Sequence, residues 1–236
     1  MSLKRNVLAN YFGQAYAAVM ALAFVPLYIK YLGVEAYGLI GIFVVLQAWL
    51  SLLDMGMKPA LAREMARFTG GGLDAQSVWD LLRSVEVLAL GIAALTGVGM
   101  YVASGWLATS WVRPEQLSET AVVQAFVLMG LVVAARFVEN IYTNSIAGLQ
   151  RQVLQNAVTV VMATLRGLGS VAVLVWVSPT IEAFFIWQGI ISVVTAFIFM
   201  GVVYKILPNP PRAARFSLTE IRNIWKFAAG MMGITF

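Results

Sequence analysis

Apolar runs of roughly 20 residues recur along this chain, and they constrain its fold more than any other feature. That length matches the hydrocarbon core of a bilayer, so each run is a candidate membrane-spanning helix. Only 11% of the 236 residues are charged, whereas about one-quarter is usual in a soluble domain. The runs are continuous and do not alternate apolar with polar residues, which favours helices over barrel strands. We therefore predict an all-α integral membrane protein.

Six spans are predicted, and the start of a seventh runs from near Ile224 to Phe236. Lys4 and Arg5 before the first run are also typical of a signal peptide, as is Ala15-Tyr16-Ala17 within it. The run is longer than a usual signal-peptide core, which favours a span that is retained. The six predicted ranges are Val7–Ile29, Tyr37–Met57, Val85–Ala103, Ala121–Thr143, Ala157–Val177 and Ile181–Tyr204.

The distribution of Lys and Arg predicts how the spans are oriented. With the N-terminus inside, twelve of the 16 basic residues flank the inner ends of the spans. The outer loops hold only Lys30 and Arg113, and Arg136 and Arg166 lie within spans. Basic residues concentrate on the cytoplasmic side of membrane proteins. The asymmetry predicts a cytoplasmic N-terminus, and it explains the net charge of +5 without a nucleic-acid partner.

Two inner segments divide the chain. Between spans two and three, Gly70-Gly71-Gly72 separates two predicted interfacial helices, Ala60–Phe68 and Asp74–Arg83. After span six, Pro208-Asn209-Pro210-Pro211 predicts a stiff linker. The predicted organisation is a six-helix transmembrane lobe at 1–207, a cytoplasmic linker at 208–219, and the truncated start of a second lobe at 220–236.

The chain contains no Cys and no His. Disulfides, thiolate or imidazole metal ligands and cysteine nucleophiles are therefore excluded within it. No metal site and no catalytic residue is predicted, and any proton chemistry falls on carboxylates.

Charged residues within the spans point to function, because a charge at membrane depth is costly and usually faces protein or water. Arg136 and Glu139 are three residues apart on span four, so a structural ion pair between them and a functional role are both open. Arg166 lies near mid-bilayer on span five and has no acid at helical spacing in that span. Its expected partner lies on another span, with Glu139 and Asp54 as the candidates.

Most of the polar residues within the predicted spans map to the inner half of the membrane. This distribution predicts a cavity open to the cytoplasm. A cavity rich in Arg and amide groups suits an anionic, sugar-bearing ligand. The predicted cavity residues are Arg166, Arg136, Glu139, Asn140, Gln14, Asn10 and Thr159.

The N-terminal third resembles the polysaccharide flippases of the Wzx type, which belong to the multidrug/oligosaccharidyl-lipid/polysaccharide (MOP) exporter superfamily, also described as MATE-like. Over residues 70–236 the resemblance is mainly one of hydropathy and spacing. The runs that carry it are Asn6–Gln14, Val25–Gly33 with Tyr37-Gly38, and Ser51–Met57 with Ala62-Arg63-Glu64.

The resemblance implies two six-helix lobes facing each other across a cavity, of which this chain supplies the first and the start of a seventh helix. The implied substrate is a polyprenyl-diphosphate-linked oligosaccharide, moved to the outer leaflet of a bacterial or archaeal cell membrane. The implied mechanism is alternating access, coupled in many members to H⁺ or Na⁺. The implied partners are that lipid-linked substrate, the membrane, a polysaccharide polymerase and a chain-length regulator.

Asp54 ends the second apolar run, just before Gly56 and Pro59 break the helix. A gating or ion-coupling role for Asp54 and a structural role, capping the next helix or pairing with Lys58, are both open.

Two other functions of the protein are also open. One is a drug/cation antiporter of the same superfamily, and the other is a membrane enzyme of the same polysaccharide pathway, for which no nucleophile–base pair is visible.

Overall fold

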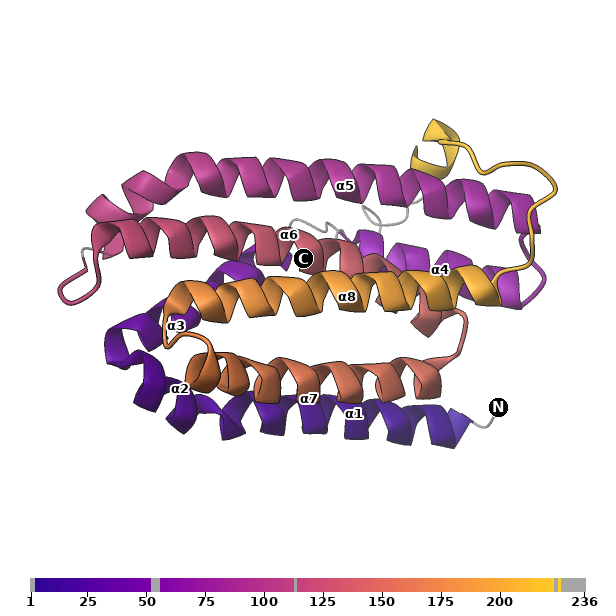
Figure 1. Cartoon of the computed structure of the whole chain (residues 1–236). Helices are drawn as coiled ribbons and strands as arrows, with labels where there is room; N and C mark the ends of the chain where they lie inside the picture. The colour runs from indigo at the N-terminus through magenta and orange to yellow at the C-terminus, as the bar shows by residue number, and fades with distance from the viewer. Residues whose placement is uncertain (1–2, 52–55, 113, 223–224, 226–236) are drawn as a thin grey trace, which may run out of the picture.

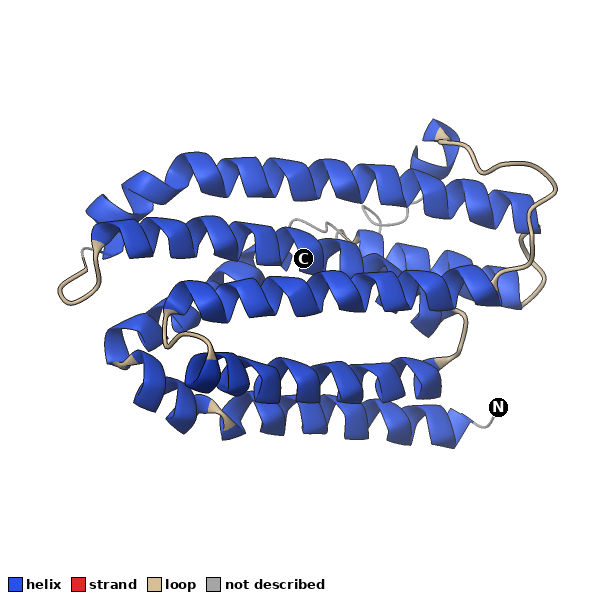
Figure 2. Ribbon diagram, viewed as in Figure 1, coloured by secondary structure: helices blue, strands red, loops and turns tan. Residues whose placement is uncertain are grey.

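The protein's structure, a computed structural model, describes residues 3–51, 56–112, 114–222 and 225, and all of the regular structure among them is helical (Figure 2). Within the described residues, eight α-helices and one short π-helical turn at Leu107–Val112 have both ends defined, and residues 218–222 are also helical. The α-helices are α1 Leu3–Ala23, α2 Val25–Leu32, α3 Val34–Ser51, α4 Met57–Thr69, α5 Ala75–Trp106, α6 Glu119–Gly148, α7 Gln152–Trp176 and α8 Ile181–Ile206.

Five segments of the described chain are long and apolar enough to cross a membrane, so the protein is a multi-pass membrane protein by helix length and hydropathy. They correspond to five of the six predicted spans. The remaining one, Tyr37–Met57, is represented by a shorter apolar helix at Val34–Trp49, and residues 52–55 lie outside the described part. The predicted seventh span also falls outside it, except for Trp225. The five segments are Leu8–Leu32, Ala75–Val112, Glu119–Gly148, Gln152–Trp176 and Ile181–Ile206.

The first span consists of two helices rather than the single one that was predicted. α1 ends at Ala23, and α2 begins at Val25 with a proline in its first turn. Pro26 has no backbone N–H to donate, so it is tolerated at the start of a helix but not in its interior. The proline therefore places the break at Phe24.

The prediction of a separate interfacial helix at Asp74–Arg83 is wrong. Asp74 is the N-cap of α5, where its carboxylate accepts a hydrogen bond of 3.3 Å from the backbone N–H of Ser77. This hydrogen bond lowers the pKa of the Asp74 carboxyl. The helix then continues without a break to Trp106, because no Gly or Pro interrupts the sequence before residue 91. The predicted interfacial segment and the membrane-spanning segment after it are thus parts of one continuous helix, α5.

The helix ends gather at the two ends of the bundle (Figure 1). The start of α1, the turn between α4 and α5, the loop between α6 and α7, and the segment after α8 lie at one end, on the right of the view. The junction of α2 with α3 and the α5–α6 and α7–α8 loops lie at the other. The first end carries the basic inner flanks of the sequence, so we call it the inner end.

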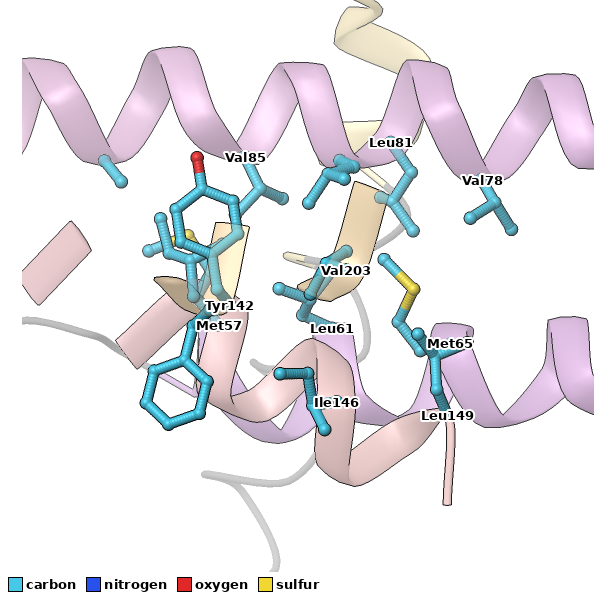
Figure 3. Packing of buried hydrophobic residues seen from close by; sticks show 14 of the residues in the cluster. Met57, Leu61, Met65, Val78, Leu81, Val85, Tyr142, Ile146, Leu149 and Val203 are labelled. Carbon is cyan, nitrogen blue, oxygen red and sulfur yellow. The ribbon is translucent and has the colours of Figure 1, made fainter. Parts of the chain in front are cut away.

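α4 confirms the predicted short helix before the Gly-rich turn, although its apolar side is buried by protein instead of lipid. Gly56 precedes it with a φ of 79°, a left-handed conformation that glycine adopts without strain. Leu61 and Met65 of α4 are at most 1% exposed. They face side chains of α5, α6 and α8 in one apolar cluster (Figure 3). We call this the inner cluster; Val78, Leu81, Ile146 and Val203 also belong to it.

A second apolar cluster, the outer cluster, contains Phe24, Leu39, Phe43, Val133 and Phe185. Arg136 follows Val133 of the outer cluster along α6 and precedes Phe137 of the inner cluster. On α8, Gln188 lies between Phe185 and Phe199 in the same way. A polar layer therefore separates the two apolar clusters inside the bundle.

The positions of the loops at the two ends of the bundle predict on which side of the membrane each loop lies. Reporter fusions after Arg67, Arg151 and Pro211 are expected to report a cytoplasmic location, and fusions near Gly33, Glu115 and Pro179 an external one. The reason is the concentration of Lys and Arg at the inner end. A cytoplasmic signal at Glu115 would contradict the orientation.

Candidate functional site

Arg136 is held in the polar layer by residues from three helices. Its guanidinium donates hydrogen bonds to Oε1 of Gln47 on α3, at 2.8 Å, and to Oε1 of Gln188 on α8, at 3.2 Å. Its Cζ also lies 5.3 Å from the centre of the Phe43 ring, in a cation–π contact. Two neutral amides and an aromatic face orient this cation but leave its charge unneutralised.

Arg166 of α7 lies beside Glu139 of α6, with Nη2 3.6 Å from Oε2 of the carboxylate. The same nitrogen donates a longer hydrogen bond of 3.4 Å to Oγ of Ser192 on α8. The expectation that a residue on another span pairs with Arg166 is confirmed for Glu139. The alternative partner, Asp54, lies outside the described residues.

Buried hydroxyl and amide groups connect the two arginines. Nε2 of Gln188 donates to Oγ of Ser170 at 3.1 Å, and that hydroxyl donates to the backbone carbonyl of Arg166 at 2.7 Å. Gln188, Ser170 and Ser192 are all at most 5% exposed. These hydrogen bonds link the guanidinium group of Arg136 to the backbone of α7 at Arg166.

Three polar atoms in this layer are buried without a hydrogen-bond partner among the described residues: Nε of Arg136, Nε of Arg166 and Oε2 of Glu139. Buried polar groups in proteins are nearly always hydrogen-bonded, so unpaired ones call for an explanation. Two unpaired N–H donors on two neighbouring cations are suited to an acceptor group that carries negative charge.

Two cavities meet at these residues. The smaller, of about 260 Å³, is lined mainly by polar side chains. The larger, of about 510 Å³, is lined mostly by apolar side chains of α1, α2, α3, α6, α7 and α8. Gln47, Arg136, Glu139 and Arg166 line both. The arrangement offers a cationic chamber beside an apolar one, which fits a ligand with an anionic part and a less polar part.

The structure brings five of the eight predicted site residues to this place. Asn140 lines the smaller cavity and Thr159 the larger, together with Arg136, Glu139 and Arg166. Asn10 and Gln14 do not line either cavity; they are exposed on α1, where Nε2 of Gln14 donates to Oδ1 of Asn10 at 3.3 Å. Asp54 lies outside the described residues.

Sequence reasoning did not single out three carboxylates that the structure shows to be well connected. Glu35, at the start of α3, accepts hydrogen bonds from the backbone N–H groups of residues 115–117 in the outer loop. Asp80 of α5 binds the guanidinium of Arg212 at 2.5 Å and accepts from the backbone N–H of Arg215. Glu86 of α5 is 5% exposed. The sequence offered one indication of this role: Glu86 lies in an apolar run, three residues after Arg83. A carboxylate buried in such a run needs hydrogen-bond or charged partners.

Comparison of the chain with protein-family models, with curated proteins and with solved structures found no match. The described residues contain no group of Asp and Glu side chains that could hold a metal ion. The structure thus defines a multi-helix membrane protein with five candidate spans and a polar layer containing two arginines.

Proposed function

We propose that the protein is a flippase that moves a polyprenyl-diphosphate-linked oligosaccharide from the cytoplasmic to the outer leaflet by alternating access. The observation that carries the proposal is the pair of buried guanidinium groups at the cavity, each with an Nε that lacks a partner among the described residues. The resemblance of the N-terminal third to polysaccharide flippases points to the same class of substrate.

A diphosphate is the anion that suits this pair best. Arginine presents a planar set of donors that matches phosphate oxygens two at a time, and a diphosphate offers such oxygens on two adjacent groups. Among the described residues that line the smaller cavity, the two arginines, Arg136 and Arg166, outnumber the one carboxylate, Glu139, even when Lys58 is left out of the count. This excess of positive charge supports an anionic substrate over the cationic substrate of a drug antiporter.

The cavity chemistry also favours transport over catalysis. Thr159 and Thr195 line the larger cavity, but the chain has no His to act as a base for them, and the described lining of the smaller cavity includes no Ser or Thr. Its amide side chains, Gln47 and Asn140, are suited to hydrogen bonds with sugar hydroxyls. We therefore propose a transporter and not an enzyme.

The proposal includes a facing lobe that completes the cavity. Asn10 and Gln14 are exposed on α1, and polar groups at membrane depth need protein or water beside them. The 236 residues expressed alone, in a strain lacking its flippase, are therefore expected to leave surface polysaccharide absent. Surface polymer measured with a polysaccharide-specific stain would check this. Restored polymer would show that the chain works alone or as a dimer.

Deletion of the gene in its own host tests the proposed activity. The expected result is loss of surface polysaccharide together with accumulation of complete lipid-linked oligosaccharide on the cytoplasmic leaflet, both reversed by the wild-type gene. Incomplete oligosaccharides would indicate a membrane enzyme of the pathway. Unchanged polysaccharide with increased drug sensitivity would indicate an antiporter. Either of these two results would contradict the proposal.

A further inference from the structure

A second polar group is buried away from the two arginines, at the inner end of the bundle. The carboxylate of Glu86 on α5 accepts hydrogen bonds from the hydroxyls of Tyr142 on α6, at 3.0 Å, and Tyr204 on α8, at 2.6 Å. Arg83, one turn earlier on α5, contacts the other carboxylate oxygen at 3.3 Å. Glu86 is thus well partnered, and it accepts one hydrogen bond from the Arg83 side chain.

These residues form the polar end of a groove across α5, α6 and α8, helices that lie side by side in Figure 1. Beyond the polar end, its cavity of about 330 Å³ is lined by apolar side chains, among them Leu90, Val138, Phe197 and Met200. On α8 the groove extends from Tyr204 to Val193, or about 16 Å at 1.5 Å per residue. That is about half the thickness of a bilayer's hydrocarbon core, the depth of one leaflet.

The polar end of the groove lies where headgroups of the inner leaflet are expected. The rings of Trp79 and Tyr204 are in edge-to-face contact, with centroids 5.0 Å apart, and Trp79 donates to the carbonyl of Pro208 in the segment after α8. Trp and Tyr favour the boundary between hydrocarbon and headgroups. The Arg83 side chain is 54% exposed at the same level, and its contact with Glu86 occupies one of its five N–H donors.

We propose that this groove binds an anionic glycerophospholipid of the inner leaflet, with its phosphate at Arg83 and one acyl chain along α8. Two observations support this occupant: the N–H donors of Arg83 that its contact with Glu86 leaves over, and the length of the groove. The basic residue stands at the headgroup level, and the apolar wall below it matches the depth of one leaflet. The site is separate from the cavity of the proposed flippase, and the inference does not depend on that function.

Photolabelling in nanodiscs tests the proposal. The purified protein is placed in phosphatidylcholine nanodiscs that contain a small fraction of phosphatidylglycerol with a diazirine on one acyl chain. After irradiation, labelled positions are mapped by mass spectrometry. We expect the label to concentrate at residues 193–200, and unlabelled phosphatidylglycerol to displace it while additional phosphatidylcholine does not. Label spread evenly over the apolar faces, or equal displacement by phosphatidylcholine, would overturn the proposal. So would stronger displacement by a polyprenyl phosphate, which would identify a different occupant.

Two variants sharpen the test, and the chain offers a matched control. Arg83→Gln is expected to reduce labelling in the groove about fivefold, the factor expected for one basic residue at an anionic surface. Ala196→Phe, which places a ring in the groove, should reduce it further. Arg67→Gln is the control, because Arg67 is 49% exposed and also pairs with a glutamate three residues away, but on α4. Equal labelling of the Arg83 and Arg67 variants would refute the assignment of Arg83, and the competition in the wild-type protein remains decisive if a variant fails to fold.

Discussion

Arg166→Gln is expected to reduce export about 100-fold in the whole protein as its host makes it. The substitution removes the planar donor group at the cavity, and hydrogen bonds to charged groups contribute about 1.5–3 kcal/mol each. Loss of about 3 kcal/mol corresponds to a factor of roughly 100. Arg166→Lys keeps the charge but loses the bidentate geometry, so we expect partial export. Surface polysaccharide and protein abundance are measured together, and export should fall much more than abundance.

The double variant Arg166→Gln with Glu139→Gln separates substrate binding from a structural role. Arg166 contacts Glu139, so removal of the arginine alone leaves a carboxylate without its cation, which is destabilising. Removing both charges relieves that penalty. If Arg166 binds substrate, abundance recovers in the double variant while export stays low. Normal export by the double variant would rule out a substrate-binding role.

Gly148→Ala is expected to destabilise the inner end of the bundle by about 1–3 kcal/mol, the usual cost of overpacking. Gly148, the last residue of α6, is buried against α4. A Cβ at this position would collide with the backbone carbonyl of Ala62 and the side chain of Met65. A backbone carbonyl cannot move aside as a flexible side chain can. The measurement is the midpoint of detergent-induced or thermal unfolding, which should fall.

Gly99→Ala is the matched control. Gly99 also lies in a helix, and a Cβ there would meet nothing within 4 Å. Alanine favours helix by about 1 kcal/mol over glycine, so this variant should unfold at or above the wild-type midpoint. If the two alanine variants behaved alike, the close contact between α4 and α6 would be refuted.

The sequence was sufficient to predict the helical class and most of the spans, because length and hydropathy directly reflect the thickness of a bilayer. It also located the cations of the polar layer, since a charge within an apolar run is conspicuous. The pairing of Arg166 with Glu139 could be proposed only as one of two alternatives, since helical spacing says nothing about which spans are neighbours. The structure places Glu139 3.6 Å from Arg166, whereas Asp54 lies outside the described residues.

The features that escaped prediction depend on contacts between distant parts of the chain. Gln47 and Gln188 lie within two of the predicted spans, but nothing in their spacing showed that both bind Arg136. The continuity of α5 through residue 83 was missed because the Gly-rich turn suggested two short helices, and the capping role of Asp74 was not recognised. Glu86 was overlooked because its partners, Tyr142 and Tyr204, come from two other helices and resemble ordinary interfacial tyrosines.

Transport of the substrate itself is the most direct test of the proposed function. The whole protein is reconstituted into proteoliposomes that carry a short polyprenyl-diphosphate oligosaccharide, and the fraction accessible to an external lectin is followed after the outer leaflet has been depleted. Wild-type protein is predicted to restore accessibility with time, and the Arg166→Gln variant at equal density to do so about 100-fold more slowly, from the same loss of about 3 kcal/mol. Accessibility that rises no faster with wild-type protein than in protein-free liposomes, or equally fast with both proteins, would contradict the account.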